Sequence, residues 1–313
     1  MDIIFFGSSK FAVPSLEALI KGRHKVVCTV TQPDKQKGRH LVFSATDVKN
    51  TASQAGLKVF QPENVNSKES IKFLREFNAD VFVIVAYGQI FSRELLDLPK
   101  IMPLNIHASL LPRYRGAAPI NWAIINGERK TGLTIFFVTP KMDAGPVMLK
   151  QETEIKESDT SETLEDRLSK QAPQLLNEAL EKIDNRQYRL IEQDEDNVVL
   201  APKLKKETGL IDWSNSAQDI RNQVRGLLPW PGAFTYLGAK ILKIFKTETS
   251  IVFAGKKHHP GEIVKADKDG ITIACGKGFL RIIELQLEAG RRMSAKDFIT
   301  GHKIAPFTVL GKK

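Results

Sequence analysis

The first 140 residues alternate short apolar runs with helix-like segments, and this alternation restricts the fold more than any other feature. Residues 3–6 (Ile-Ile-Phe-Phe) form an unbroken apolar run, which is typical of a strand buried on both faces of a parallel sheet. Strands alternating with helices indicate a parallel sheet with right-handed crossovers. We therefore expect an α/β, Rossmann-like domain. Its further strands are expected near residues 25–31, 58–60, 80–87, 102–108 and 134–138.

The pattern changes after residue 190. An acidic run at 193–197 is followed by a basic, turn-rich run at 201–209. We interpret 191–208 as an interdomain linker between a catalytic domain at 1–190 and a smaller domain at 209–313. One helix is expected at 217–227, and short strands separated by turn signals indicate an all-β domain. These strands are expected near 232–236, 241–245, 261–265, 271–274 and 279–285.

The positive charge is confined to the last third of the chain. The net charge is +10, residues 1–202 carry 26 Lys and Arg against 26 Asp and Glu, and residues 203–313 carry 20 against 10. A lysine-rich surface can simply keep a protein in solution. A surplus confined to one segment nevertheless favours a polyanionic partner such as a nucleic acid.

The bulk composition is that of a cytoplasmic protein. No apolar run reaches the roughly 18 residues of a membrane helix, and the start Met-Asp-Ile has no basic region of a secretory signal. The two cysteines, Cys28 and Cys275, lie in strand-like runs and are expected to be buried thiols in a reducing compartment. The six histidines show no metal-ligand spacing, so we expect no metal.

A candidate site follows the strand near 102–108. Asn105 and His107 are two residues apart, so on a strand their side chains leave the same face. Asp143 lies in a second loop, after the run at 133–138. An amide donor, an imidazole and a carboxylate that orients it are parts suited to acyl transfer. An isolated Asn-x-His pair is more often structural, and an Asp before Gly-Pro is often only a turn-former.

Several runs together resemble the signature of the folate-dependent formyltransferases. They are Asn-Ile-His at 105–107, Ser-Leu-Leu-Pro at 109–112, Arg-Gly-Ala-Ala-Pro at 115–119, the loop of Asp143, and Pro-Trp-Pro-Gly-Ala-Phe-Thr at 229–235. The similarity covers nearly the whole chain. It implies a C-terminal OB-like β-barrel and formyl transfer from 10-formyltetrahydrofolate. The closest resemblance, within the family, is to enzymes that formylate the α-amino group of methionyl initiator tRNA for translation initiation.

The resemblance also assigns roles to residues. Asn105 would donate a hydrogen bond to the formyl oxygen as it becomes negative, and such a donor contributes about 2.7–4 kcal/mol. His107 would move the proton, and Asp143 would orient His107 and favour its charged form. The folate pocket would be lined by Ser109, Leu110, Leu111, Pro112, Ala86, Tyr87 and Gly88.

For tRNA, the resemblance points to the loop at 32–40, where Arg39 matches the arginine of a basic family loop that enters the acceptor end. The next residues depart from the family, which commonly continues with two lysines and Pro-Ser-Pro-Val-Lys. Lys35 and Lys37 are expected to compensate. Lys240, Lys243 and Lys246 in the barrel are candidates for contacts to the tRNA backbone, but they are three apart and cannot all share one strand face. Backbone contacts are expected from Lys203, Lys205 and Lys206 in the linker.

Two other functions remain open at this point. Formylation of an amino-sugar nucleotide would use the same catalytic signature. A nucleic-acid-binding protein with an inactive formyltransferase-like domain would retain the charge but not the chemistry. The basic C-terminal third favours tRNA, and intact Asn105, His107 and Asp143 favour an enzyme. We expect a monomer that does not bind a membrane.

Overall fold

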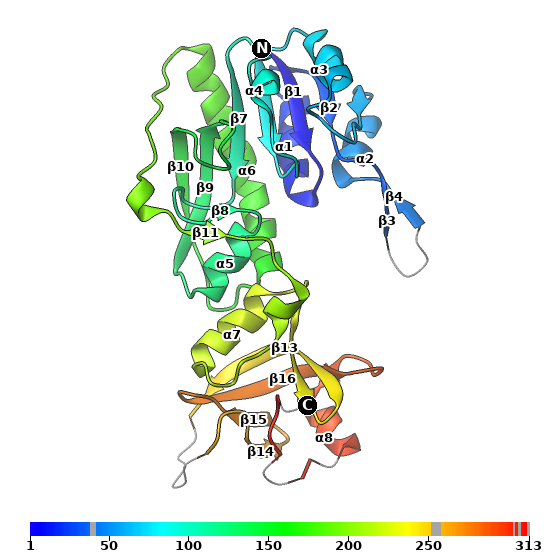
Figure 1. The fold of residues 1–313 in the computed structure, drawn as a ribbon, viewed down its shortest axis with the longest axis vertical. Coiled ribbons are helices and arrows are strands. Elements are labelled where there is room, and N and C mark those ends of the chain that lie inside the picture. The colour runs from blue at the N-terminus through cyan, green and yellow to red at the C-terminus, as the bar shows by residue number, and fades with distance from the viewer. Residues whose placement is uncertain (38–41, 252–257, 303, 306–307, 312–313) are drawn as a thin grey trace. The chain divides into compact units, whose positions relative to one another are not determined.

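The computed structural model describes residues 1–37, 42–251, 258–302, 304–305 and 308–311. The chain forms two compact units (Figure 1). The N-terminal unit comprises Met1–Pro119, Lys130–Glu154 and Glu165–Pro202, and the C-terminal unit comprises Ile120–Arg129, Ile155–Leu164 and Lys203–Lys313. The change at 202–203 falls inside the segment predicted as a linker. Two segments of the predicted catalytic domain, 120–129 and 155–164, group with the C-terminal unit.

The N-terminal unit is built on a mixed sheet with the strand order β10-β9-β7-β6-β1-β2-β5. Neighbouring strands from β7 to β5 are parallel, and Ile3 to Phe6 of β1 are fully buried, as expected for a strand covered on both faces. The strands are β1 (Asp2–Gly7), β2 (Lys25–Val30), β5 (Val59–Phe60), β6 (Val81–Val85), β7 (Met102–His107), β9 (Lys130–Phe137) and β10 (Val147–Glu154). The Rossmann-like prediction is confirmed.

The expectation of a wholly parallel sheet is wrong at one edge. β9 runs antiparallel to β7, and β10 runs antiparallel to β9. The connection from β9 to β10 spans only residues 138–146, whereas a parallel connection needs a crossover of about a dozen residues or more. The strand β10 was not predicted.

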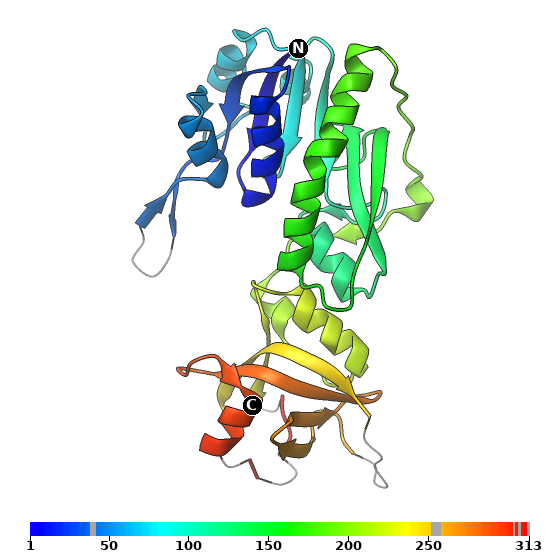
Figure 2. The ribbon, with the colours of Figure 1, turned by 180° about the vertical axis from the view of Figure 1, so that it is seen from behind.

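The helices of the N-terminal unit are short, except one. They are α1 (Val13–Lys21), α2 (Asp47–Gln54), α3 (Lys68–Arg75), α4 (Arg93–Leu96) and α6 (Ser161–Asp184), whose first turn belongs to the C-terminal unit. Figure 2 shows α1 and α6 on the same side of the sheet. An aromatic cluster of Phe6, Phe82, Tyr87 and Phe91 fills part of the core.

The C-terminal unit contains an antiparallel sheet with the order β12-β13-β16-β15-β14, and β17 pairs with β16. Its strands are β12 (Ala233–Leu237), β13 (Lys240–Ser250), β14 (Ile263–Asp267), β15 (Gly270–Ala274), β16 (Phe279–Leu287) and β17 (Met293–Ser294). The helices are α5 (Pro119–Ile125), which belongs to this unit from Ile120 onward, α7 (Ala217–Gly226) and α8 (Ala295–Gly301). The predicted helix at 217–227 is α7, whereas α8 was not predicted, and residues of both helices share one apolar core with the strands.

Cys28 and Cys275 are buried free thiols, as predicted, and burial raises the pKa of each to about 12. Within the described ranges, no helix is both long and apolar enough to cross a membrane.

Candidate active site

Strand β7 presents Asn105 and His107. Asn105 pairs with Ile84 of β6 on one side and with Phe136 of β9 on the other, so its backbone is fixed from both sides. The Asn105 side chain is half-buried and His107 is only 7% exposed. Because alternate residues of a strand share a face, the amide and the imidazole leave β7 together.

Asp143 reaches the same place by an indirect path. β9 ends at Phe137, which pairs with Leu104 of β7. The loop after β9 therefore starts opposite a position on β7 that lies three residues before His107. The loop then returns along β7, and its Asp143 Oδ2 lies 3.6 Å from His107 Nδ1. Gly116 N–H donates to the same oxygen at 2.8 Å, and Asp143 adopts a left-handed φ of +50°. The hypothesis of an inactive fold therefore loses its structural argument, which required Asp143 to lie far from His107.

The other ring nitrogen of His107 is also occupied. His107 Nε2 lies 2.8 Å from the carbonyl oxygen of Tyr114, which has a left-handed φ of +64°. A carbonyl oxygen can only accept, so Nε2 carries a hydrogen atom. At 3.6 Å, Asp143 is a charge partner of Nδ1 rather than a close hydrogen-bond partner. Both nitrogens thus face acceptors, and an imidazolium formed in a reaction would be stabilised on both sides.

The loop 109–112 is held by hydrogen bonds to Arg113 and to Thr134 of β9. Ser109 Oγ donates to the Arg113 carbonyl at 2.6 Å, and Thr134 Oγ1 donates to the Ser109 carbonyl at 2.7 Å. Leu111 N–H donates to Thr134 Oγ1 at 3.1 Å. Ser109 and Leu111 are fully buried. Their side chains were predicted to line a folate pocket, but in the structure the Ser109 hydroxyl serves the loop itself.

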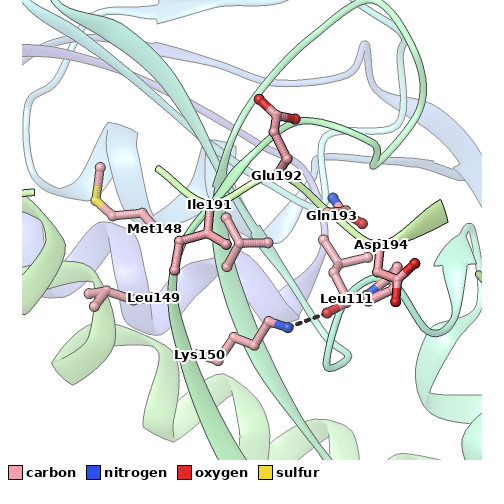
Figure 3. A pocket seen from close by; sticks show the side chains of 10 residues that line it. Leu111, Met148, Leu149, Lys150, Ile191, Glu192, Gln193 and Asp194 are labelled. Atoms are coloured by element: carbon pink, nitrogen blue, oxygen red, sulfur yellow. Dashed lines mark hydrogen bonds between the residues drawn. The ribbon is translucent and has the colours of Figure 1, made fainter. Parts of the chain in front are cut away.

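A pocket of about 420 Å³ lies beside this loop (Figure 3). Two of its lining residues are joined by a hydrogen bond, in which Lys150 Nζ donates to the Leu111 carbonyl oxygen. The pocket is lined by Leu111, Pro112, Val147, Met148, Leu149, Lys150, Ile191, Glu192, Gln193 and Asp194. The lining includes two of the predicted folate residues, Leu111 and Pro112, but not Leu110, which is half-buried, and none of the three candidate catalytic residues.

The turn after β6 carries the other predicted folate residues. Ala86 and Gly88 are exposed, with left-handed φ values of +46° and +94°, and nothing lies within 4 Å of a Cβ built on Gly88. A flat ring can therefore approach this backbone closely. Tyr87 differs, because its ring is buried against Phe6 and Phe91, and burial raises the pKa of its hydroxyl. Tyr87 therefore offers its backbone rather than its ring to a ligand at this turn, and its place in the folate pocket stays a prediction.

The predicted cationic residues are placed as follows. Lys35 is exposed on β3 (Lys35–Lys37), which pairs with β4 (Val42–Ser44), and the backbone of Lys37 ends β3. Arg39 lies outside the described residues. Lys203, Lys205 and Lys206 are all exposed, at the start of the C-terminal stretch of their unit.

The spacing argument against a shared lysine face on β13 is wrong for two of the three residues. The β13–β16 register shifts between Ile244 and Thr247, so these two buried residues are three positions apart instead of two. Lys243 and Lys246 therefore both lie on the exposed face, although the sequence spacing excluded it. A β-bulge has this effect because it inserts one residue into the alternation.

Three residues near the site were missed by the sequence analysis. Gln193 and Glu195 were interpreted as linker residues, and Arg115 was noted only as part of a motif. Arg115 is 5% exposed and donates to both, through Nε to Gln193 Oε1 at 3.0 Å and through a terminal nitrogen to Glu195 Oε1 at 2.9 Å. The hydrogen bonds of Arg115 and Lys141 hold the pKa of Glu195 down at about 2. No sequence signal connects residues that are about 80 positions apart.

No cluster of three or more potential metal ligands occurs in the part of the chain that the structure describes.

Fold and site together match one class of protein. Residues 1–180 match the family described as formyl transferase, and residues 203–303 match the formyl transferase C-terminal domain. An N-formyltransferase from Helicobacter canadensis, solved in complex with folinic acid and dTDP-3-aminofucose, has a similar fold. The TM-score is 0.65 at 19% identity, over 90% of this chain and 98% of that one.

Closer relatives are similar along their full length. A methionyl-tRNA formyltransferase of Citrifermentans bemidjiense is 47% identical over 100% of this chain and 97% of the relative. Another, of Caldanaerobacter subterraneus, is 44% identical over 99% of this chain and 100% of the relative. The chain therefore belongs to the formyl transferase family of enzymes and, within it, to the methionyl-tRNA formyltransferases.

Proposed function

We propose that this enzyme transfers a formyl group from 10-formyltetrahydrofolate to the α-amino group of methionyl initiator tRNA. The observation that carries the proposal is the 3.6 Å approach of Asp143 to His107, on the strand that also presents Asn105. This arrangement combines a neutral donor, a proton carrier and a charge that stabilises the carrier.

In the proposed reaction, the lone pair of the α-amino nitrogen forms the new C–N bond at the formyl carbon. Asn105 donates a hydrogen bond to the formyl oxygen while that oxygen is negative. Nδ1 of His107, the ring nitrogen that carries no hydrogen in the neutral form, accepts the proton that the attacking nitrogen must lose, and Asp143 stabilises the resulting imidazolium. His107 then returns the proton to the folate nitrogen, whose bond to the formyl carbon breaks. The proton count is balanced, and no oxidant or metal is needed.

The folate donor is proposed to bind at the turn after β6. The open backbone at Ala86 and Gly88 fits a flat ring, since no side chain covers the Cβ position of Gly88. Leu110 and Pro112 of the neighbouring loop contribute apolar surface in this proposal. The rigid hydrogen bonding of the loop supports it, because a fixed wall reduces the entropy lost on binding.

The tRNA is proposed to bind through the basic C-terminal third, which we interpret as an OB-like β-barrel joined near residues 191–208 to a catalytic domain at 1–190. Exposed lysines support this assignment, including Lys203, Lys205 and Lys206. Arg39, Lys35 and Lys37 are proposed to contact the acceptor end. The substrate places the enzyme in the cytoplasm, and we propose that it acts as a monomer.

The test offers methionyl initiator tRNA and amino-sugar nucleotides in parallel, with 10-formyltetrahydrofolate as donor. We expect formyl on the tRNA only, at a kcat/KM that falls steeply with salt because several phosphates are neutralised. A charge-reversal variant of Lys203, Lys205 and Lys206 should reduce both kcat/KM and its salt slope. Formyl transfer to the sugar nucleotide alone would support the assigned catalytic residues and reject tRNA as the substrate. No transfer to either acceptor would favour a nucleic-acid-binding protein without this activity.

A further inference from the structure

The segment 191–201 was predicted as part of a linker. In the structure it contacts both the loop that follows His107 and the loop that carries Asp143. It pairs with the start of β10 through Ile191, whose backbone exchanges hydrogen bonds with Val147 at 2.8 and 2.9 Å. It then pairs with the loop after His107, where β11 (Leu200–Ala201) lies parallel to β8 (Arg115–Gly116). We call residues 191–201 the strap.

Gln193 is the strap residue that holds Asp143. Its Nε2 donates to the carbonyl oxygens of Asp143, at 2.9 Å, and of Gly145, at 2.7 Å. Its Oε1 accepts from Arg115 Nε at 3.0 Å. Gln193, which is labelled in Figure 3, therefore donates from its amide nitrogen to the loop of Asp143 and accepts at its amide oxygen from the loop of Arg115.

Asp143 needs such support. Its left-handed φ of +50° costs free energy for any residue other than Gly, although less for Asp than for most, and surrounding contacts must offset that cost. The neighbouring Gly145 is equally constrained, because a Cβ there would lie 1.8 Å from the Phe137 carbonyl oxygen. The two carbonyls that Gln193 binds belong to these two constrained residues, so its hydrogen bonds hold the loop where its backbone is least tolerant of change.

Arg115 completes the arrangement from the other loop. Its guanidinium is buried and holds both Gln193 and Glu195, while Lys141 of the Asp143 loop reaches the second oxygen of Glu195 at 2.9 Å. The backbone of the next residue, Gly116, donates to Asp143 Oδ2. The backbone of Asp143 is thus held by Gln193, which Arg115 binds, and its carboxylate is held by Gly116, the residue after Arg115.

We propose that Gln193 is a positioning residue for catalysis: it fixes the Asp143 backbone so that the carboxylate faces His107, and it does not touch substrate. The inference deepens the proposed formyl transfer and rests on it for its kinetic consequence. Misplacing a catalytic group by about 1 Å can lower the rate by about a hundredfold. We therefore expect kcat to fall while the KM for both substrates stays nearly constant.

The sharpest variant is Gln193→Glu, because it keeps the size and the acceptor for Arg115 but turns an oxygen toward two carbonyl oxygens. Gln193→Leu removes all three hydrogen bonds, and Gln187→Glu is the matched control on an exposed glutamine of the same unit. We expect kcat to fall about 10- to 100-fold in both Gln193 variants, with KM values within about twofold. The control should match the wild type.

Two further measurements separate positioning from general instability. In an Asp143→Asn background, Gln193→Leu should lower kcat by less than about twofold, because residues that act through one another are not additive. Amide hydrogen exchange across 139–147 should accelerate in the Gln193 variants while the melting temperature changes little. If Gln193→Leu does not fold, Gln193→Glu carries the same comparison.

The outcomes distinguish this inference from the proposed function. Unchanged kcat and unchanged exchange at 139–147 would overturn the positioning role while formyl transfer by the wild type stands. Full additivity with Asp143→Asn would also overturn it. If the wild type transferred no formyl group, the proposed function would fail, and faster exchange at 139–147 in the variants would still support the hold of Gln193 on the loop.

Discussion

Replacing Asp143 by Asn tests the central electrostatic argument of the site. The substitution removes the charge but keeps the size and an oxygen that can accept from Gly116 N–H, now 2.8 Å from Oδ2. The 3.6 Å separation from His107 Nδ1 corresponds to about 4–5 kcal/mol between unit charges at an effective dielectric constant of about 20. The carboxylate is 12% exposed, so water reduces this value. We expect the loss to be about 3–4 kcal/mol, or about 10²–10³ in kcat.

The assay is formyl transfer under saturating donor and acceptor, with kcat and KM determined separately. KM should change little, because Asp143 acts on a charge that exists only after attack. Asp97→Asn is the control, since it makes the same substitution in the same unit but on an exposed carboxylate, 3.0 Å from Arg93. A kcat within about threefold of wild type, with the melting temperature unchanged, would refute the use of this charge in catalysis.

Three further predictions address the donor, the strap and the core. Asn105→Ala should lower kcat about 10²–10³-fold in the same formyl-transfer assay, and an unchanged kcat would exclude its role as a donor to the formyl oxygen. The pKa of Glu195, held at about 2 chiefly by Arg115, lies below the ordinary value of about 4.3, so its stabilising effect is present above about pH 4.3 and is lost toward pH 2. The melting-temperature difference between wild type and Glu195→Gln should therefore shrink as the pH falls from 5 to about 3, and a constant difference would contradict this. Cys28 and Cys275, whose pKa values are raised to about 12, should resist iodoacetamide at pH 8 until urea is added, as mass spectrometry would show.

Much of the N-terminal sheet could be predicted because it depends on local patterns. The buried run at 3–6 and the polar pair Asn105 and His107 follow from strand periodicity, which the chain carries residue by residue. The short strands of the C-terminal third were also placed to within a few residues, because turn signals separate them. The sequence alone therefore predicted that Asn105 and His107 leave the same face of the catalytic strand.

Other features depended on which strands become neighbours. The reversal of β9 against β7 brings the loop of Asp143 back along the catalytic strand, and periodicity cannot distinguish parallel from antiparallel pairing. The bulge that puts Lys243 and Lys246 on one face is likewise invisible in the spacing of the lysines. Tyr87 was predicted as a pocket residue because it follows a strand, but its ring packs against Phe6 in the aromatic core.

The strap shows the same division most clearly. Residues 193–197 are acidic and polar, and composition alone favours an exposed linker there. The tertiary structure brings Gln193 to the carbonyls of Asp143 and Gly145, about 50 residues away, and Arg115 to Gln193, about 80 away. The sequence determined which groups could perform the chemistry, because residue type and strand alternation are local. Only the tertiary structure decided which residues hold them, because a hydrogen bond between distant segments exists only once both backbones are fixed.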